Sequence, residues 1–169
     1  KAGRSIGPDI IEKWALEFGL GGPTGIDLPM ESKGFVPDKH WKRNVIKEPW
    51  YEGDTVNLSI GQGYLLVTPL QMARLTCAMA NGGYLVQPHL IKSINNQEII
   101  KNKGRKISVS SKSLSILKQD MKKVISENYG TGHRARVEGI SMAGKTGTAE
   151  AGSGAAHAWF IGFAPTEEP

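Results

Sequence analysis

The sequence predicts an α+β domain. Three segments have the apolar periodicity of helices that bury one face, at residues 8–19, 69–81 and 111–129. Four further segments have the composition of strands, at residues 84–91, 94–100, 140–150 and 158–164. Because these strands and helices do not alternate regularly, their order indicates an α+β architecture.

Length and composition limit the class of protein. The chain has 169 residues, of which 39% are hydrophobic and 22% charged, which is typical of one globular domain. Its single cysteine excludes an internal disulfide framework, and its four scattered histidines lack the spacing of a structural zinc site. No apolar run approaches the roughly 18 to 20 residues of a membrane span. We expect no metal ion and no cofactor.

The first helix is predicted at residues 8–19. Pro8 suits the first helical position, and Asp9 complements the positive end of the helix dipole. Gly19 ends the segment. One face is apolar and should be buried; it consists of Ile10, Ile11, Trp14, Ala15 and Phe18.

The second helix is predicted at residues 69–81. Thr68 can cap its start, and Pro69 follows at the first helical position. The segment is apolar nearly all round, so we expect it to be buried on most sides. Cys77 should then pack inside it as a small apolar residue.

The third helix is predicted at residues 111–129. Ser111 serves as its cap, and Gly130 ends it. A single apolar stripe should face the core, formed by Leu114, Leu117, Met121, Val124 and Ile125.

The two strands at 140–150 and 158–164 are predicted to form an antiparallel hairpin. The flexible loop between them contains His157. In the strand at 84–91, Pro88 marks an edge or a break. Residues 25–57 show little periodicity, and we expect a long ordered loop there. Long ordered loops are often functional.

A short motif, Lys145-Thr146-Gly147-Thr148, lies within the strand at 140–150. Lys145 supplies a positive charge and Thr146 a hydroxyl, while Gly147 removes a side chain where a ligand backbone can lie close. A peptide could add along this strand edge, and the N–H of Thr148 could stabilise an oxyanion. The alternative is a surface strand with a solvated lysine, because Lys-Thr-Gly also occurs by chance.

Longer segments reduce that ambiguity. Residues 143–149 and 158–165 resemble two adjacent central strands of the penicillin-binding transpeptidases, a family in which Lys-Thr-Gly is a signature. Four upstream segments resemble the same family in the same order, at residues 19–29, 49–55, 60–64 and 68–73. The form Trp-Tyr-Glu-Gly-Asp-Thr at 50–55 is most similar to the penicillin-binding protein 2 branch, whose members are class B elongation transpeptidases.

The resemblance implies a peptidoglycan D,D-transpeptidase, in which a serine attacks the terminal D-Ala-D-Ala of a stem peptide. β-Lactams acylate the same serine. Lys145 would then belong to the catalytic machinery, Lys145 and Thr146 would bind the donor carboxylate, and Gly147 and Thr148 would complete the substrate site. The implied partners are the stem peptide, β-lactams, the rest of the same domain and elongation-machinery membrane proteins, at the periplasmic face of the inner membrane.

The family's nucleophile motif, Ser-x-x-Lys, has no true match. We expect residues 1–169 to be a partial transpeptidase domain without the upstream nucleophile region, the Ser-x-Asn motif and the final strand and helix, and to be inactive alone. Ser115 to Lys118 and Ser126 to Asn128 fit the two motifs by letter. Ser115 is expected inside a helix, however, where a nucleophile lacks exposure and a neighbouring oxyanion donor.

Three alternatives remain at this point. The chain could be a non-catalytic module that binds D-Ala-D-Ala peptides or envelope material, or a fragment similar to a class A β-lactamase. The net charge of +5 and the cluster of Lys101, Lys103, Arg105 and Lys106 also allow a binder of anionic polymers. Because no aromatic residue is interleaved with that cluster, we expect no nucleic-acid partner.

Overall fold

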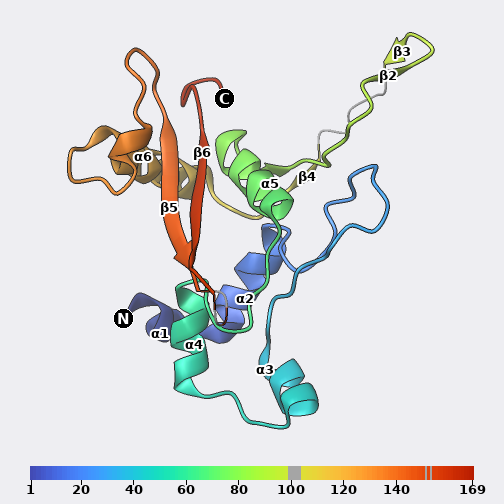
Figure 1. The fold of residues 1–169 in the computed structure, drawn as a ribbon, viewed down its shortest axis with the longest axis vertical. Helices are drawn as coiled ribbons and strands as arrows, with labels where there is room; N and C mark the ends of the chain where they lie inside the picture. The colour runs from blue at the N-terminus through green and yellow to red at the C-terminus, as the bar shows by residue number, and fades with distance from the viewer. Residues whose placement is uncertain (99–103, 151, 153) are drawn as a thin grey trace.

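The computed structural model describes residues 1–98, 104–150, 152 and 154–169. Its centre is the antiparallel hairpin of β5 (Ala143–Ala149) and β6 (His157–Phe163). Helix α6 (Ser111–Ser126) packs against β5, and α5 (Pro69–Ala80) packs against β6. Figure 1 shows these two helices beside the hairpin and the N-terminal helices at its far end. The α+β prediction is confirmed.

Two small clusters form the core. One joins Ala78, Leu85 and Ile107, and the other joins Met79, Met121 and Ala143. The half-buried ring of Phe18, just after α2 (Pro8–Glu17), packs against both. Helices α5 and α6 therefore bury part of their apolar faces around the base of the β5–β6 hairpin. The expected burial of the apolar face of α2 is wrong: the helix buries no residue, and Ile10 and Trp14 are exposed, because only Phe18 at its end reaches the core.

Helix α5 begins as the sequence predicts. The hydroxyl of Thr68 accepts the N–H of Gln71, and the Gln71 carboxamide accepts the N–H of Thr68 at 2.9 Å. Gln71 is fully buried and also donates to the carbonyls of Gly22 and Lys33, both at 2.8 Å. Helix α5 therefore contributes to the core and also binds the backbone at Gly22 and Lys33.

The expected burial of Cys77 is wrong, because this side chain is exposed. It lies on the face of α5 that lines a groove with Trp159 to Ala164 of β6 and the residues after it. The apolar residues around the helix show which faces can be buried. Which faces are in fact covered depends on the elements packed beside the helix.

The long loop expected at residues 25–57 is also wrong. This region contains α3 (Lys39–Trp41), the π-helical turn η1 (Lys42–Ile46) and α4 (Glu52–Ser59). Local caps start the helices: Asp38 accepts the N–H of Trp41, and Asp54 accepts the N–H of Tyr51 at 2.7 Å. The apolar period is weak because α4 buries only Thr55 and Leu58. A further short helix, α1 (Ala2–Ile6), packs on α4.

The predicted strands at 84–91 and 94–100 are mostly replaced by shorter pieces. β1 (Tyr84–Leu85) pairs with β4 (Arg105–Lys106), and β2 (Ser93–Ile94) pairs with β3 (Gln97–Glu98). Asn95 and Asn96 both adopt positive φ and reverse the chain inside the second predicted strand. Residues 99, 100, Lys101 and Lys103 lie outside the described part of the chain.

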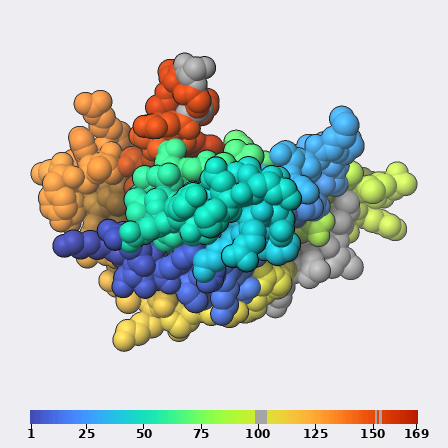
Figure 2. Space-filling model, turned by 90° about the horizontal axis from the view of Figure 1, so that it is seen from below, coloured from blue at the N-terminus to red at the C-terminus, as the bar shows by residue number. Residues whose placement is uncertain are grey.

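The helix boundaries differ slightly from prediction. Ser110, rather than Ser111, caps α6 by accepting the N–H of Ser113 at 3.0 Å, and the helix ends at Ser126. The remaining element is the 3₁₀ turn η2 (His133–Ala135). In Figure 2 the end of the β5–β6 hairpin and the β2–β3 hairpin project from the body of the molecule.

Candidate functional site

The motif strand lies where the sequence places it. β5 and β6 form one antiparallel ladder in which Lys145 faces Ile161, Gly147 faces Trp159 and Thr148 faces Ala158. The predicted hairpin is confirmed. His157, expected in the loop, instead opens β6 opposite Ala149.

One edge of β5 has no strand beside it within the described residues. The carbonyl of Thr146 accepts the Lys145 ammonium, and the carbonyl of Thr148 accepts the Gln62 side-chain amide at 3.3 Å. Residues two apart in an antiparallel ladder direct their N–H and C=O groups to the same edge. The backbone groups of Thr146 and Thr148 therefore face this free edge, where an extended peptide could pair with them.

The cation of the motif is free of carboxylate partners. Lys145 is exposed and makes no ion pair with any described residue. Thr146 is half-buried beside it, and Thr148 is exposed. An anionic group at this edge would meet an ammonium and a hydroxyl without displacing an existing ion pair.

A second threonine reaches the motif from outside the strand. Thr131 lies in the loop after α6, and its hydroxyl is 2.7 Å from the hydroxyl of Thr146. The N–H of Gly132 donates to the Val124 carbonyl at 3.0 Å, which ties this loop to the end of α6. Our sequence interpretation missed Thr131; the two glycines flanking it were the available signal.

A cavity of about 270 Å³ lies along the motif strand. Its lining is mainly apolar and includes all residues from Lys145 to Ala149; the other members are Leu20, Ile60, Gly61, Leu65, Val67, Met72, Trp159 and Ile161. Small-molecule sites commonly combine such an apolar lining with a few polar groups. Trp159 thus lines the candidate site.

The segment from Gly61 to Gly63 forms a turn and also contacts the site. Gly61 and Gly63 both have positive φ, which side chains disfavour. The N–H of Gln62 donates to the Asn57 carbonyl at 2.8 Å and fixes the turn to the end of α4. The carboxamide of Gln62 then reaches the carbonyl of Thr148, so this turn contacts the motif strand.

Helix α4 rests on a buried ion pair. The Lys42 side chain is 3% exposed and contacts Asp54, whose side chain is 15% exposed. The ammonium also lies 4.6 Å from the ring centre of Tyr51. Burial disfavours the charge on Lys42, but the hydrogen bond and charge of Asp54 outweigh it, so the pKa of Lys42 lies above its usual value. Asp54 thus joins the start of α4 to Lys42, because it accepts the N–H of Tyr51 and pairs with the ammonium.

Two aromatic residues before and at the start of α4 support this packing. The indole N–H of Trp50 donates to the Thr55 hydroxyl at 2.9 Å, and Tyr51 covers the Lys42 ammonium. Neither residue lines the cavity along β5.

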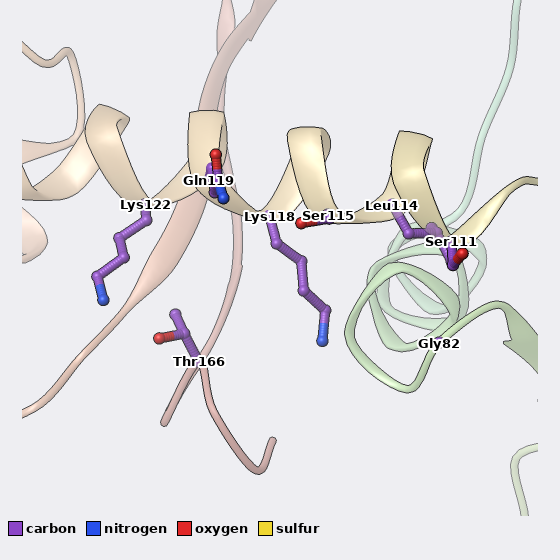
Figure 3. Close-up of a pocket in the computed structure, with 8 residues that line it drawn as sticks. All are labelled: Gly82, Ser111, Leu114, Ser115, Lys118, Gln119, Lys122 and Thr166. Atoms are coloured by element: carbon purple, nitrogen blue, oxygen red, sulfur yellow. The ribbon is translucent and has the colours of Figure 1, made fainter.

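Ser115, the residue that mimics a nucleophile motif, lies within α6, as expected, but its side chain is exposed, so the expected lack of exposure is wrong. It lines a separate cavity of about 380 Å³ with Lys118, Lys122 and Thr166, shown in Figure 3. No residue of the Lys145–Thr148 motif lines that cavity. The backbone N–H groups around Ser115 are engaged within the helix, so they cannot serve as oxyanion donors.

In the part of the chain that the structure describes, none of the helices has the length and apolar character to cross a bilayer. Within the same residues, none of the His, Cys, Asp and Glu side chains gather in threes or more as a metal site would require.

A comparison with known families matches residues 1–169 to the penicillin binding protein transpeptidase domain. The chain belongs to this family. Two curated relatives are both named peptidoglycan D,D-transpeptidase MrdA. The Haemophilus influenzae protein is 32% identical over 98% of this chain, and the Acinetobacter baumannii protein is 34% identical over 97%. The chain spans only 29% and 27% of their lengths.

Solved structures of the family have the same fold. Pseudomonas aeruginosa PBP2, in complex with WCK 5153, matches with a TM-score of 0.89 at 32% identity, over 99% of this chain and 38% of its own. Helicobacter pylori PBP2, in complex with MreC, matches with a TM-score of 0.83 at 38% identity, over 99% of this chain and 31% of its own. The chain is thus a fragment of a PBP2/MrdA-type transpeptidase domain.

Proposed function

We propose that this chain is part of a peptidoglycan D,D-transpeptidase that cross-links stem peptides and binds β-lactams. Family membership and the MrdA relatives support the proposal. The observation that carries it is the free edge of β5, where Lys145 is exposed and the carbonyls of Thr146 and Thr148 accept side-chain donors, beside an apolar cavity that the motif residues line. Donor peptides and β-lactams both present a carboxylate and an acyl carbonyl to such an edge.

Each motif residue has a proposed role. The Lys145 ammonium and the Thr146 hydroxyl bind the carboxylate of the donor, since charge-assisted hydrogen bonds are the stronger kind. Thr131 orients the Thr146 hydroxyl. Gly147 leaves room for the donor backbone, and the N–H of Thr148, on the free edge, stabilises the oxyanion that forms on the attacked carbonyl.

The reaction needs a serine that is not among these residues. Its oxygen attacks the acyl carbonyl, D-alanine departs with the proton, and the acyl-enzyme then passes its acyl group to an amine of a neighbouring strand. We propose that this serine belongs to another part of the same domain, and that residues 1–169 are inactive alone. The geometry of Ser115 supports this.

The same proposal gives the partners and location. The first partner is the rest of the transpeptidase domain. The Helicobacter pylori PBP2 structure contains MreC, which supports elongation-machinery proteins as further partners. A protein with this function acts on the periplasmic face of the bacterial inner membrane, where peptidoglycan is cross-linked.

Intact-mass spectrometry with benzylpenicillin tests the function. The product of the complete reading frame should gain one acyl adduct on a serine outside residues 1–169. Lys145→Met should slow adduct formation by about 100-fold, because a charge-assisted contact to the carboxylate is lost. Residues 1–169 alone should gain none.

Two outcomes would contradict the proposal. An adduct on Ser115 would make the chain a self-contained acylating enzyme. If the complete protein takes no adduct but a D-Ala-D-Ala peptide shifts the NMR signals of Lys145 to Thr148, the chain is a non-catalytic binding module.

A further inference from the structure

The carbonyl of Thr148 has a partner from a distant part of the chain. Gln62 is 86 residues away in sequence, and its Nε2 donates to this carbonyl at 3.3 Å. The two edge carbonyls of the motif are therefore both occupied by side-chain donors, Lys145 on Thr146 and Gln62 on Thr148. Edge strands need such partners because their polar groups are otherwise unpaired.

The two donors differ in how firmly they are held. The ammonium of Lys145 lies at the end of a flexible side chain from the same strand. Gln62 is half-buried and sits between two glycines with φ near 76° and 79°, with its own N–H bonded to Asn57. Its contact therefore links two separate structural units, the α4 end and the motif strand.

The base of this turn is anchored in the interior. Helix α4 carries Asp54, which pairs with the buried Lys42, and Thr55, which accepts the Trp50 indole. Asp54, Asn57 and Gln62 line one small cavity of about 300 Å³ beside this ion pair. In Figure 1 the arrowhead end of β5 lies beside α4, as the contact between Gln62 and Thr148 requires.

We propose that Gln62 is a positioning residue that acts through Thr148. Its amide fixes the orientation of the Thr148 backbone at the free edge, and the Lys42–Asp54 pair fixes the turn that presents it. The inference rests on the proposed function, in which the N–H of Thr148 stabilises the oxyanion. The 3.3 Å contact is long, and hydrogen bonds of this kind often shorten only when a ligand is bound.

The test measures acylation of the complete protein by a chromogenic β-lactam, separating the dissociation constant from the acylation rate constant. Gln62→Met keeps the size of the side chain and removes the donor. We expect its acylation rate constant to fall about fivefold to tenfold, the worth of about one hydrogen bond, with the dissociation constant changed less than about twofold. A misaligned oxyanion donor affects the transition state more than the bound ligand.

Gln87→Met is the matched control. Gln87 also donates a side-chain amide to a backbone carbonyl, that of Gly25 at 2.6 Å, but in a loop that does not line the β5 cavity. It should acylate at the wild-type rate, and both variants should keep the wild-type melting temperature. Equal rates for Gln62→Met and wild type would overturn the inference while leaving the function intact, and so would a change confined to the dissociation constant. A wild-type protein that is not acylated would instead overturn the proposed function.

Discussion

Lys42 and Lys145 carry the same charge in opposite surroundings. Lys42 is buried, pairs with Asp54 and lies against the ring of Tyr51. Lys145 is exposed on the free edge of β5, and its ammonium contacts only a backbone carbonyl among the described residues. A cation whose charge is satisfied by the protein stabilises the fold, whereas one left without a carboxylate remains available to a ligand.

The largest expected effect tests the first half of this comparison. Lys42→Met leaves Asp54 partly buried without a cation, and should lower the free energy of unfolding by about 3 to 5 kcal/mol. Urea denaturation followed by tryptophan fluorescence measures it. Lys145→Met should change this free energy by less than about 0.5 kcal/mol, because an exposed side chain is lost.

Lys39→Met is the second control, because Lys39 forms an exposed pair with Asp9 at 2.7 Å. The loss of this exposed ion pair should lower the free energy of unfolding by less than about 1 kcal/mol. If Lys42→Met proves no more harmful than Lys39→Met, the buried pair does not stabilise the fold and the contrast with Lys145 fails.

A smaller effect concerns the ligand side of the comparison. Thr131→Val removes the hydroxyl partner of Thr146 and keeps the shape, so acylation by benzylpenicillin should slow about fivefold. Thr131→Ser retains the hydroxyl and should acylate at nearly the wild-type rate. Equal slowing in both variants would contradict a role for the hydroxyl, because Thr131→Ser retains it.

The smallest effect concerns an ion pair that is less buried than that of Lys42 but, unlike Lys145, has an opposite charge beside it. Glu17 accepts the N–H and the hydroxyl of Ser108 and pairs with Arg105 at 3.1 Å. These hydrogen bonds hold the pKa of Glu17 below its usual value of 4.5. A lowered pKa means that the ionised group stabilises the fold above about pH 4.5, and that this stability is lost as the pH falls through the folded-state pKa.

The measurement compares melting temperatures at pH 7 and at about pH 3. Wild type should exceed Glu17→Gln at pH 7, and the difference should shrink at low pH. Glu12 gives the opposite sign as a control, because burial and the charges of Asp38 and Asp9 raise its pKa. Glu12→Gln should therefore be the more stable protein at pH 7, with its advantage lost in acid. A Glu17 difference that does not shrink would contradict the assignment.

Local signals in the sequence predicted much of the fold. Thr68 and Pro69 predicted the start of α5, and the apolar stripe predicted α6 to within three residues at its end. The motif strand and its partner were predicted as an antiparallel hairpin, which the register confirms. The elements that were missed, α3 and α4, lack a periodic apolar face because their anchoring is polar: Asp38 caps the first and Asp54 the second.

The family and the strand that carries Lys145 to Thr148 could be predicted from the sequence, because both depend on residues adjacent in the chain. Tertiary packing brings Thr131 and Gln62 to this strand, buries Lys42 and leaves Cys77 exposed. Periodicity reports which faces of an element are apolar, but it does not report which partner covers them. Contacts between residues as distant as Gln62 and Thr148 arise from packing and leave no local pattern to detect.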